Sequence, residues 1–397
     1  MIPYGRQDVT QADIDAVVEV LRSDFLTQGS AVPRFEAAIA DKVTARYAVA
    51  VNSATSALHV ACLALGLGPG DVLWTVPNTF VASANCARYC GADVDFVDID
   101  PDTWNLSVQG LADKLVRARQ DDKLPKIVVP VHFGGQPTDQ DAIWELGREY
   151  GFKILEDASH SIGASRLGEP VGSCRWSDIV VFSFHPVKIV TTGEGGIAVT
   201  NDASLAERMS MLRSHGITRD RAKFRYASSQ PDSTGCSSDS YGTWSYEQQA
   251  LGFNYRMTDL QAALGSSQLQ RLETYVQRRN ELAGRYQLAF QGLPIRLPTI
   301  RPGNRSAFHL YVVRVSGSPP GSRSRVFTEL RGKGIGVNVH YTPVHLQPYY
   351  RERGFGEGAF PESEAYGREA ITIPLYPRLT DELQDQVIDA LRAAIGC

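Results

Sequence analysis

Residues 179–196 read IVVFSFHPVKIVTTGEGG: an apolar run, then Lys188, then a glycine-rich turn. The run 179–184 is almost continuously apolar rather than alternating, which is typical of a parallel strand buried on both faces. Open sheets of such strands bind ligands beyond the carboxyl ends of the strands. The stretch therefore predicts an α/β sheet with a lysine at its ligand-binding edge.

Other short apolar runs alternate with helical stretches along the first half of the chain. Together with the run above they predict a mostly parallel sheet flanked by helices, the pattern of an α/β domain. The further predicted strands are 48–51, 72–76, 94–99, 127–132, 152–155 and 197–199.

A second, smaller α+β domain is predicted after the sheet. We place a large α/β domain at residues 1–265, with its N-terminal segment 1–30 near the site, and the small domain at 266–397. A polar, serine-rich stretch at 221–247 is expected to be a loop that could cover a site. Within the small domain we expect strands at 310–315 and 337–341 and helices at 325–333 and 381–395.

Composition excludes several classes of function. The hydrophobic fraction is 43%, the charged fraction 21% and the net charge −4, so nothing favours binding to nucleic acid or to an acidic membrane surface. No apolar stretch is long enough for a transmembrane helix, and residues 1–6 lack the features of a signal peptide. The six cysteines form no disulfide framework and the eight histidines no metal-ligand spacing. We therefore expect a soluble, cytoplasmic protein without a metal site.

Lys188 and Asp157 together suggest a particular cofactor. Asp157 follows the apolar run 152–155, so both residues are expected at the carboxyl edge of the sheet. A lysine that forms a Schiff base and an acid that keeps a pyridine nitrogen protonated are the pair that pyridoxal phosphate (PLP) requires. Taken singly, a surface lysine and a helix-capping aspartate would be the simpler readings.

Small hydroxylated residues provide candidate ligands for the cofactor phosphate. Residues 52–58, NSATSAL, lie where a strand passes into a helix, and free N–H groups at a helix N-terminus attract phosphate. An ordinary helix cap explains the same residues. Ser183 could donate a further hydrogen bond, and Phe80 could stack on the cofactor ring or simply pack in the core.

These motifs, in this order, resemble the DegT/StrS family of PLP-dependent nucleotide-sugar aminotransferases. The resemblance rests on SFHPVK at 183–188, TTGEGG at 191–196 and NYRMTDLQAALG at 254–265, and extends from LTQG at 26–29 to HYTP at 340–343. It implies the type I aminotransferase fold and a homodimer whose active sites are shared between subunits. A related branch of sugar dehydratases has histidine in place of the lysine, so Lys188 favours transamination.

The resemblance also assigns roles to residues. It makes Lys188 and Asp157 the catalytic pair, and Asn254 would reach the phosphate of the neighbouring subunit. The implied cofactor-binding residues are Thr55, Ser56, Phe80, Asp157, His160, Ser183, Lys188 and Asn254. The implied substrate-binding residues are Tyr4, Asp24, Phe25, Leu26, Thr27, Ala54, Ser183, Asn254, His340, Tyr341, Thr342 and Pro343.

Within the family, the chain looks most similar to aminotransferases of the pseudaminic-acid pathway. The opening PYGRQ at 3–7 and the stretch RSHGIT at 213–218 carry this likeness. It implies glutamate as amino donor and a UDP-linked 4-keto-6-deoxy-N-acetylhexose of the L-altrose series as acceptor.

Other functions remain open on the sequence. The substrate could instead be the precursor of another 4-amino sugar, such as perosamine or aminoarabinose, or the protein could bind PLP without turnover as a regulator. A Rossmann dehydrogenase is disfavoured because GLGPG at 66–70 follows a helix rather than a strand and lacks the GxGxxG spacing.

Overall fold

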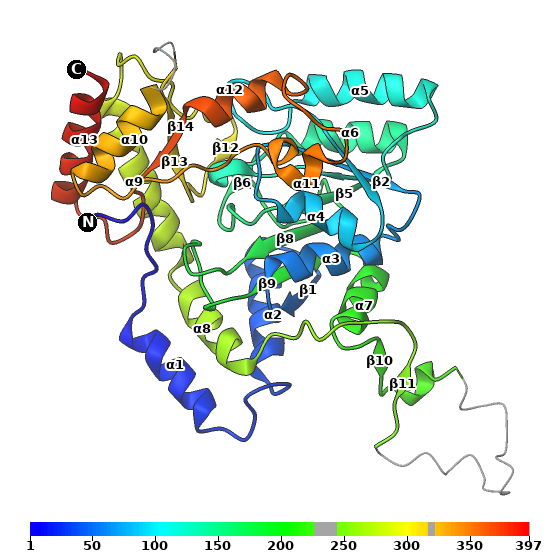
Figure 1. The fold of residues 1–397 in the computed structure, drawn as a ribbon. Coiled ribbons are helices and arrows are strands. Elements are labelled where there is room, and N and C mark those ends of the chain that lie inside the picture. The colour runs from blue at the N-terminus through cyan, green and yellow to red at the C-terminus, as the bar shows by residue number, and fades with distance from the viewer. Residues whose placement is uncertain (226–243, 317–321, 397) are drawn as a thin grey trace, which may run out of the picture.

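The computed structural model describes residues 1–225, 244–316 and 322–396, and its centre is a seven-stranded sheet (Figure 1). The strand order is β1-β9-β8-β5-β4-β2-β3. The bounds are β1 Tyr47–Val51, β2 Val72–Thr75, β3 Asp93–Phe96, β4 Ile127–Val129, β5 Lys153–Asp157, β8 Ile179–Ser183 and β9 Gly196–Thr200.

The sheet is mostly parallel, as predicted. Strands β3, β2, β4, β5 and β8 run parallel to one another, and β9 pairs antiparallel with both β8 and β1. Each apolar run of the sequence overlaps one of these strands, so the predicted fold class is confirmed. Runs 94–99 and 127–132 extend beyond the ends of their strands, and Val131 of the second run lines the cavity described below.

Helices cover both faces of the sheet, which explains the continuous apolar runs. Successive side chains of a strand point to opposite faces. Val181 packs in the core beneath α3 and α4, whereas Val180 and Phe182 pack in the core beneath α2 and α8. The helices of the first face are α3 Ala54–Ala64, α4 Ala82–Tyr89 and α7 Ala203–Leu212. Those of the second are α2 Ala31–Val43, α5 Val108–Gln120, α6 Gln140–Tyr150 and α8 Asp259–Leu269.

Beyond α8 the chain builds a second core around the two-stranded sheet of β13 Tyr311–Arg314 and β14 Ala370–Ile373. Side chains of α9, α10 and α13 fill this core. The strand predicted at 337–341 is wrong: only Asn338 bridges Thr372 of β14, and the residues that follow it line a cavity instead of continuing along β14. The helices are α9 Leu272–Ala289, α10 Ser322–Gly332, α11 Pro348–Arg351, α12 Pro361–Glu369 and α13 Asp381–Ile395.

The remaining elements are short. Helix α1, Gln11–Leu21, lies beside α8 at the periphery of the molecule (Figure 1). Of the predicted loop at 221–247, residues 226–243 lie outside the described part of the chain. The small strands are β6 Ser165–Arg166, β7 Glu169–Pro170, β10 Ile217–Thr218, β11 Glu247–Gln248 and β12 Asn304–Arg305. In the described ranges, no helix combines the length and apolar character that crossing a membrane requires.

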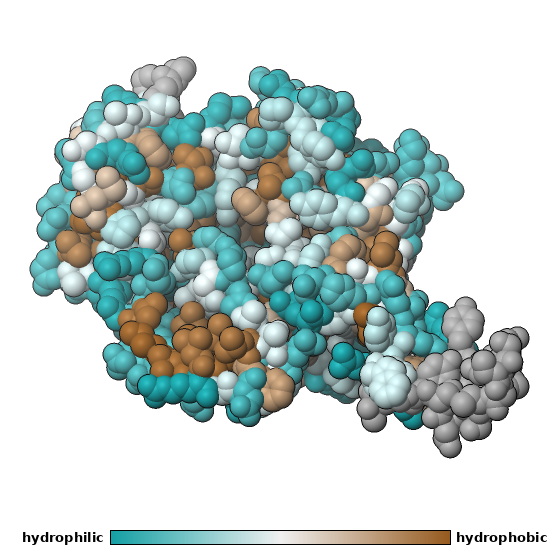
Figure 2. Space-filling model, turned by 60° about the horizontal axis from the view of Figure 1, so that its bottom comes forward, coloured by the Kyte–Doolittle hydropathy of each residue, from teal (hydrophilic) through white to brown (hydrophobic). Residues whose placement is uncertain are grey.

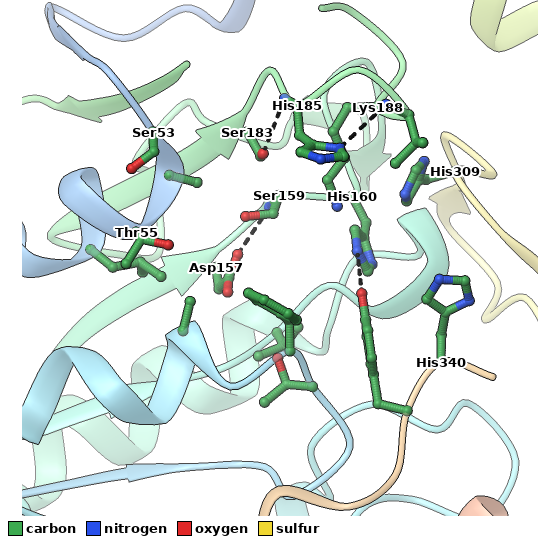
Figure 3. A pocket seen from close by; sticks show the side chains of 18 of the residues that line it. Ser53, Thr55, Asp157, Ser159, His160, Ser183, His185, Lys188, His309 and His340 are labelled. Carbon is green, nitrogen blue, oxygen red and sulfur yellow. Dashed lines mark hydrogen bonds between the residues drawn. The ribbon is translucent and has the colours of Figure 1, made fainter. Parts of the chain in front are cut away.

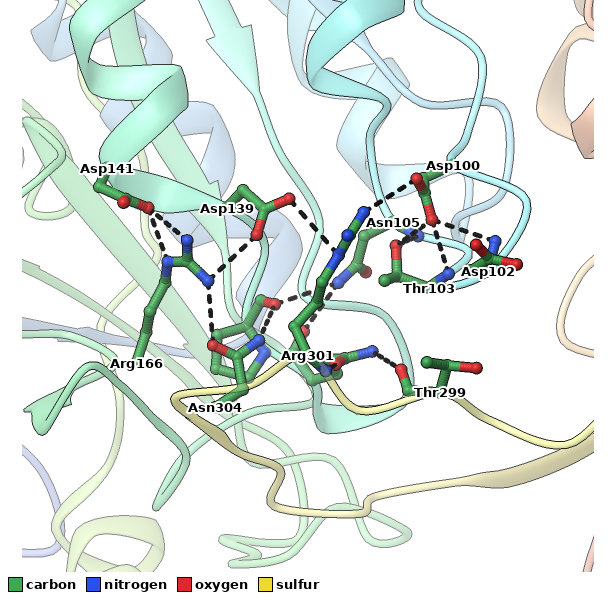
Figure 4. A network of polar contacts seen from close by, with 12 residues as sticks. Asp100, Asp102, Thr103, Asn105, Asp139, Asp141, Arg166, Thr299, Arg301 and Asn304 are labelled. Atoms are coloured by element: carbon green, nitrogen blue, oxygen red, sulfur yellow. Dashed lines mark hydrogen bonds and ion pairs between the residues drawn. The ribbon is translucent and has the colours of Figure 1, made fainter.

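A polar network fastens the segment that follows α9 to the loops beside β4 (Figure 4). Arg166 binds the carboxylates of Asp139 and Asp141, and it also donates to the side chain of Asn304. The side chain of Gln136 donates to the Thr299 carbonyl at 2.9 Å and accepts from the Arg301 amide at 2.8 Å. These contacts fix the chain just before it reaches the site at His309.

A buried aspartate attaches the N-terminal part of the chain to α8. The Asp259 carboxylate accepts hydrogen bonds from the backbone amides of Gly29 at 2.7 Å, Ala31 at 2.7 Å and Val32 at 3.2 Å. Two of these amides belong to the first turn of α2, which has no partner for them within the helix. Asp259 is 1% exposed, so water does not replace it as an acceptor.

We predict that Asp259→Ala lowers the free energy of unfolding by about 2–4 kcal/mol, because buried amides that lose a charged acceptor remain unsatisfied. Urea denaturation measures the change. Asp113→Ala, on the exposed face of α5, is the control and should stay within about 0.5 kcal/mol of the parent. Equal denaturation midpoints for the two variants would contradict the anchoring role.

Candidate active site

A cavity of about 590 Å³ lies beyond the carboxyl ends of β5 and β8 (Figure 3). The sheet and its loops contribute Asp157, Ser183 and Lys188. The part of the chain that follows α9 contributes a further group of side chains, among them His309 and His340. The cavity is therefore built from both cores of the molecule, at the edge of the sheet where the sequence predicts a ligand.

The N-terminus of α3 forms one wall of the cavity. Ser53 caps this helix, because its Oγ accepts a hydrogen bond from the Ser56 amide at 3.1 Å. A Cβ atom on Gly196 would lie 2.4 Å from the nitrogen of Ala54, so only glycine lets β9 approach the first turn of α3 this closely. Unpaired amides and the helix dipole make this wall suited to a phosphate.

Asp157, the last residue of β5, is held in a fixed orientation. Its carboxylate accepts a hydrogen bond from the Ser83 hydroxyl at 2.6 Å and another from the Ser159 amide at 3.1 Å. The Thr79 hydroxyl lies 2.8 Å from that of Ser83 and donates to it, since the Ser83 proton is directed to Asp157. Asp157 is only 5% exposed, so Ser83 of α4 and the Ser159 amide, rather than water, set its orientation.

Lys188 lies in the turn between β8 and β9. Burial lowers the pKa of its amine to about 8, although the charge of Asp157 acts in the opposite direction. An amine with such a pKa is largely protonated at pH 7 yet deprotonates within reach of physiological pH. Its nucleophilic form is thus more accessible than that of an ordinary surface lysine.

His160 closes the cavity in an uncharged state. The Gly134 amide donates to its Nδ1 at 3.3 Å, so the proton of the ring is on Nε2, which faces the hydroxyl of Tyr341 at 3.4 Å. Burial holds the pKa of His160 well below its usual range, and the charge of Lys188 lowers it further. His340, whose pKa burial lowers to about 3, is uncharged as well.

The predicted site residues fall into two groups. Around the cavity the structure brings together Tyr4, Ala54, Thr55, Phe80, Asp157, His160, Ser183, Lys188, His340 and Tyr341. The residues that do not line it are Asp24, Phe25, Leu26, Thr27, Ser56, Asn254, Thr342 and Pro343. The Ser56 hydroxyl is directed away, to the side chain of Asn52 at 2.7 Å, and Asp24 and Phe25 border a separate hollow beside Asp259. The cavity lining separates the two groups, and the roles assigned to the residues of both groups remain predictions.

Sequence reasoning missed Ser83, Ser159 and His309. Ser83 belongs to the segment that suggested Phe80, but its use as a partner of Asp157 depends on contact between α4 and β5. Ser159 acts through its backbone amide, which has no side-chain signature. His309 stands alone in the sequence before a strand, and only the fold brings it to the cavity.

The cavity fits PLP. Lys188 and Asp157 line the same cavity. PLP requires such a pair, because an amine holds the cofactor and an acid pairs with its ring nitrogen. The first turn of α3 and Ser183 provide hydrogen-bond donors for the phosphate, and Phe80 offers an exposed aromatic ring at the cavity wall.

Comparisons with known proteins agree with this geometry. The family model of the DegT/DnrJ/EryC1/StrS aminotransferases matches residues 7–392. The chain is 40% identical to the spore coat polysaccharide biosynthesis protein SpsC of Bacillus subtilis, over 98% of this chain and 96% of that protein.

Solved structures give the same result. Spr1654 of Streptococcus pneumoniae, described as a sugar aminotransferase and solved in its PMP form, superposes with a TM-score of 0.88 at 30% identity, covering 100% of this chain and 99% of that one. PseC of Helicobacter pylori, an aminotransferase involved in the biosynthesis of pseudoaminic acid, gives a TM-score of 0.87 at 28% identity, with 99% of each chain covered.

We predict that cofactor-free protein captures added PLP at a rate that rises with pH and levels off above about pH 8, because only the uncharged amine of Lys188 attacks a carbonyl. Stopped-flow absorbance measures the rate. Lys188→Arg keeps a cation but has no such nucleophile and should not capture PLP. A rate that still climbs steeply near the ordinary lysine pKa of about 10.4 would contradict the perturbed amine.

Proposed function

The chain belongs to the DegT/DnrJ/EryC1/StrS aminotransferase family, and from this premise we propose that it aminates carbon 4 of a UDP-linked 4-keto-6-deoxy-N-acetylhexose of the L-altrose series. It is a sugar aminotransferase with PLP as its cofactor. The observation that carries the proposal is that Lys188, Asp157 and the N-terminus of α3 face a single cavity. Glutamate is the proposed amino donor.

PLP supplies an electron sink when bound, and the side chains of the chain perform the remaining tasks. Asp157, fixed by Ser83 and the Ser159 amide, is placed to keep the ring nitrogen protonated. Lys188 would hold the cofactor, and its free amine would be the group that takes and returns the proton of the substrate carbon. Its pKa of about 8 suits both tasks, since the amine can lose and regain a proton near neutral pH.

The identity of the sugar is supported by resemblance rather than by a contact. PseC of H. pylori acts in pseudoaminic acid biosynthesis and superposes over 99% of this chain, which supports a reaction in that pathway. SpsC, whose name assigns it to a spore coat polysaccharide, is more similar in sequence. The precursors of perosamine and aminoarabinose are the alternatives to test.

We also propose that the active protein is a homodimer with shared sites. Lys188 is the single lysine or arginine among the described residues that line the cavity. A UDP-sugar and glutamate are both anionic, so further cations and polar groups are needed from outside this subunit. Asn254, which does not line the cavity of its own chain, is available to the cavity of a second copy.

An apolar surface on and near α1 supports this assembly. Figure 2 shows apolar side chains gathered on the face of the molecule that carries this helix. Ile14 is 48% exposed, Leu21 56%, Phe25 60% and Leu26 48%. Large apolar side chains grouped on a surface mark an interaction site. Residues 24–27, predicted to bind substrate, are part of the same surface.

A two-substrate absorbance experiment tests the proposed reaction. We predict that glutamate shifts the absorption band of the bound cofactor to shorter wavelength, and that the UDP-4-keto-6-deoxy-N-acetylhexose then restores it. The 4-keto precursors of perosamine and aminoarabinose serve as competing acceptors, and mass spectrometry identifies the amino sugar. Lys188→Arg should show neither change.

The other outcomes separate the alternatives. Restoration by one of the competing precursors alone would replace the proposed sugar while leaving the aminotransferase in place. A cofactor band that responds to neither glutamate nor any acceptor would indicate a PLP-binding protein without turnover.

We predict that Leu21→Glu combined with Phe25→Glu shifts the protein from dimer to monomer, because each charge would lie in the apolar contact. Light scattering coupled to gel filtration gives the mass. Leu288→Glu on α9, a residue 75% exposed and far along the chain from this surface, is the control and should leave the mass unchanged. A double variant that remains dimeric would place the interface elsewhere.

A further inference from the structure

Asn338 lines the cavity, yet the reaction described above does not use it. It is the single asparagine or glutamine among the described residues of the cavity lining. Its backbone is tied to β14, because the Asn338 amide donates to the Thr372 carbonyl at 3.1 Å and its carbonyl accepts from the Thr372 amide at 2.8 Å. The side chain is half-buried, so the chain presents a carboxamide to the cavity from a fixed position.

Neighbouring groups also fix the orientation of this carboxamide. The Val339 amide donates to Oδ1 of Asn338 at 2.8 Å, and Nδ2 lies 3.5 Å from Nε2 of His340. Burial, which lowers the pKa of His340 to about 3, leaves that ring with a single proton. An amide nitrogen only donates, so Nε2 accepts, and the ring proton is on Nδ1, which lies 2.7 Å from the Thr372 hydroxyl.

The carboxamide of Asn338 keeps part of its hydrogen-bonding capacity. A carboxamide has two donor hydrogens and two acceptor lone pairs. Asn338 uses one of each on Val339 and His340, and its side chain has no other partner in the part of the chain that the structure describes. One donor and one acceptor therefore remain for a ligand. His340 uses both ring nitrogens within the protein and offers the cavity only its ring.

The surroundings of Asn338 are largely apolar. Val339 follows it and also lines the cavity. The ring of His340 lies 5.4 Å from that of Tyr4 and 5.0 Å from that of Tyr341, measured between centroids, and all three residues line the cavity. Apolar groups gain free energy when such surfaces remove them from water. This part of the cavity therefore suits a substituent in which a polar group and a methyl group lie side by side.

Asn338 lies opposite the wall that is suited to a phosphate. Figure 3 shows His340 across the cavity from Ser53 and Thr55, which stand at the N-terminus of α3. Asn338 contacts His340 and belongs to the same side. Its carboxamide is therefore available to a substrate rather than to the cofactor phosphate.

We propose that Asn338 is a specificity-determining residue that binds the acetamido group of the acceptor sugar. Its carboxamide makes a hydrogen bond to the amide of this group, and the acetamido methyl packs against Val339 and the rings of Tyr4 and His340. The proposal rests on the proposed function, in which the acceptor is an N-acetylhexose.

The amino donor fits this part of the cavity less well. The carboxylates of glutamate only accept hydrogen bonds, so the free lone pair of Asn338 Oδ1 would face another acceptor. An acetamido group has both an N–H and a carbonyl, so either free position of the carboxamide finds a partner. A sugar hydroxyl can also pair with Asn338, but it brings no methyl group to the apolar surface beside it.

Calorimetric titration of the PLP-loaded protein with two stable nucleotide sugars tests the proposal. UDP-N-acetylglucosamine and UDP-glucose differ in the acetamido group, and both lack a ketone, so neither is aminated. The parent should bind UDP-N-acetylglucosamine more tightly than UDP-glucose. Asn338→Leu should weaken the binding of UDP-N-acetylglucosamine about fivefold, the loss expected for one hydrogen bond, and leave the binding of UDP-glucose nearly unchanged.

UDP-glucose is the matched control within each variant. Equal affinities of the parent for the two probes would overturn the proposal while leaving the proposed reaction intact. An equal loss for both probes in Asn338→Leu would overturn it too, since the substitution would then disturb the cavity as a whole. Asn338→Ala replaces the leucine variant if melting curves show that the latter is unfolded. A parent that binds neither probe would refute the UDP-sugar as acceptor, and this proposal with it.

Discussion

The parallel pairing of β5 with β8 is the constraint on which the rest of the site depends. Asp157 pairs with Val181, so the two strands end at the same edge of the sheet. Asp157 at the end of β5 and Lys188 in the turn after β8 therefore line the same cavity. Gly196 lets β9 pass close to the first turn of α3, and this turn forms the wall of the cavity that is suited to a phosphate. A shift of one residue between β5 and β8 would turn Asp157 to the opposite face.

Much of the fold follows from the sequence because burial on both faces leaves a strong signal. Strand β8, Ile179–Ser183, is apolar at four consecutive positions and could be predicted without knowing its neighbours. The segment 337–341 also contains apolar residues, yet it forms no strand and makes only one bridge, at Asn338. Whether such a segment pairs depends on the distant β14, and that information is not local.

The site was predictable where motifs carry the chemistry, as for Lys188 and Asp157, and not where the fold supplies a partner. Ser83 orients Asp157 from another helix, and Arg279 holds the turn at His309 through backbone carbonyls. Neither relation has a fixed spacing in the chain. The predicted residues outside the cavity, such as Asn254, would contribute to a site only in the homodimer proposed above.

The central claim, that Lys188 is the residue that holds PLP, is tested most directly by chemical fixation. The PLP-loaded protein is treated with borohydride, which makes the link between PLP and its lysine permanent, and is then digested and mapped by mass spectrometry. The account predicts that the phosphopyridoxyl group is found on the peptide containing Lys188 and disappears in Lys188→Arg. A modified peptide that lacks Lys188, or none in a protein that retains PLP, would contradict it.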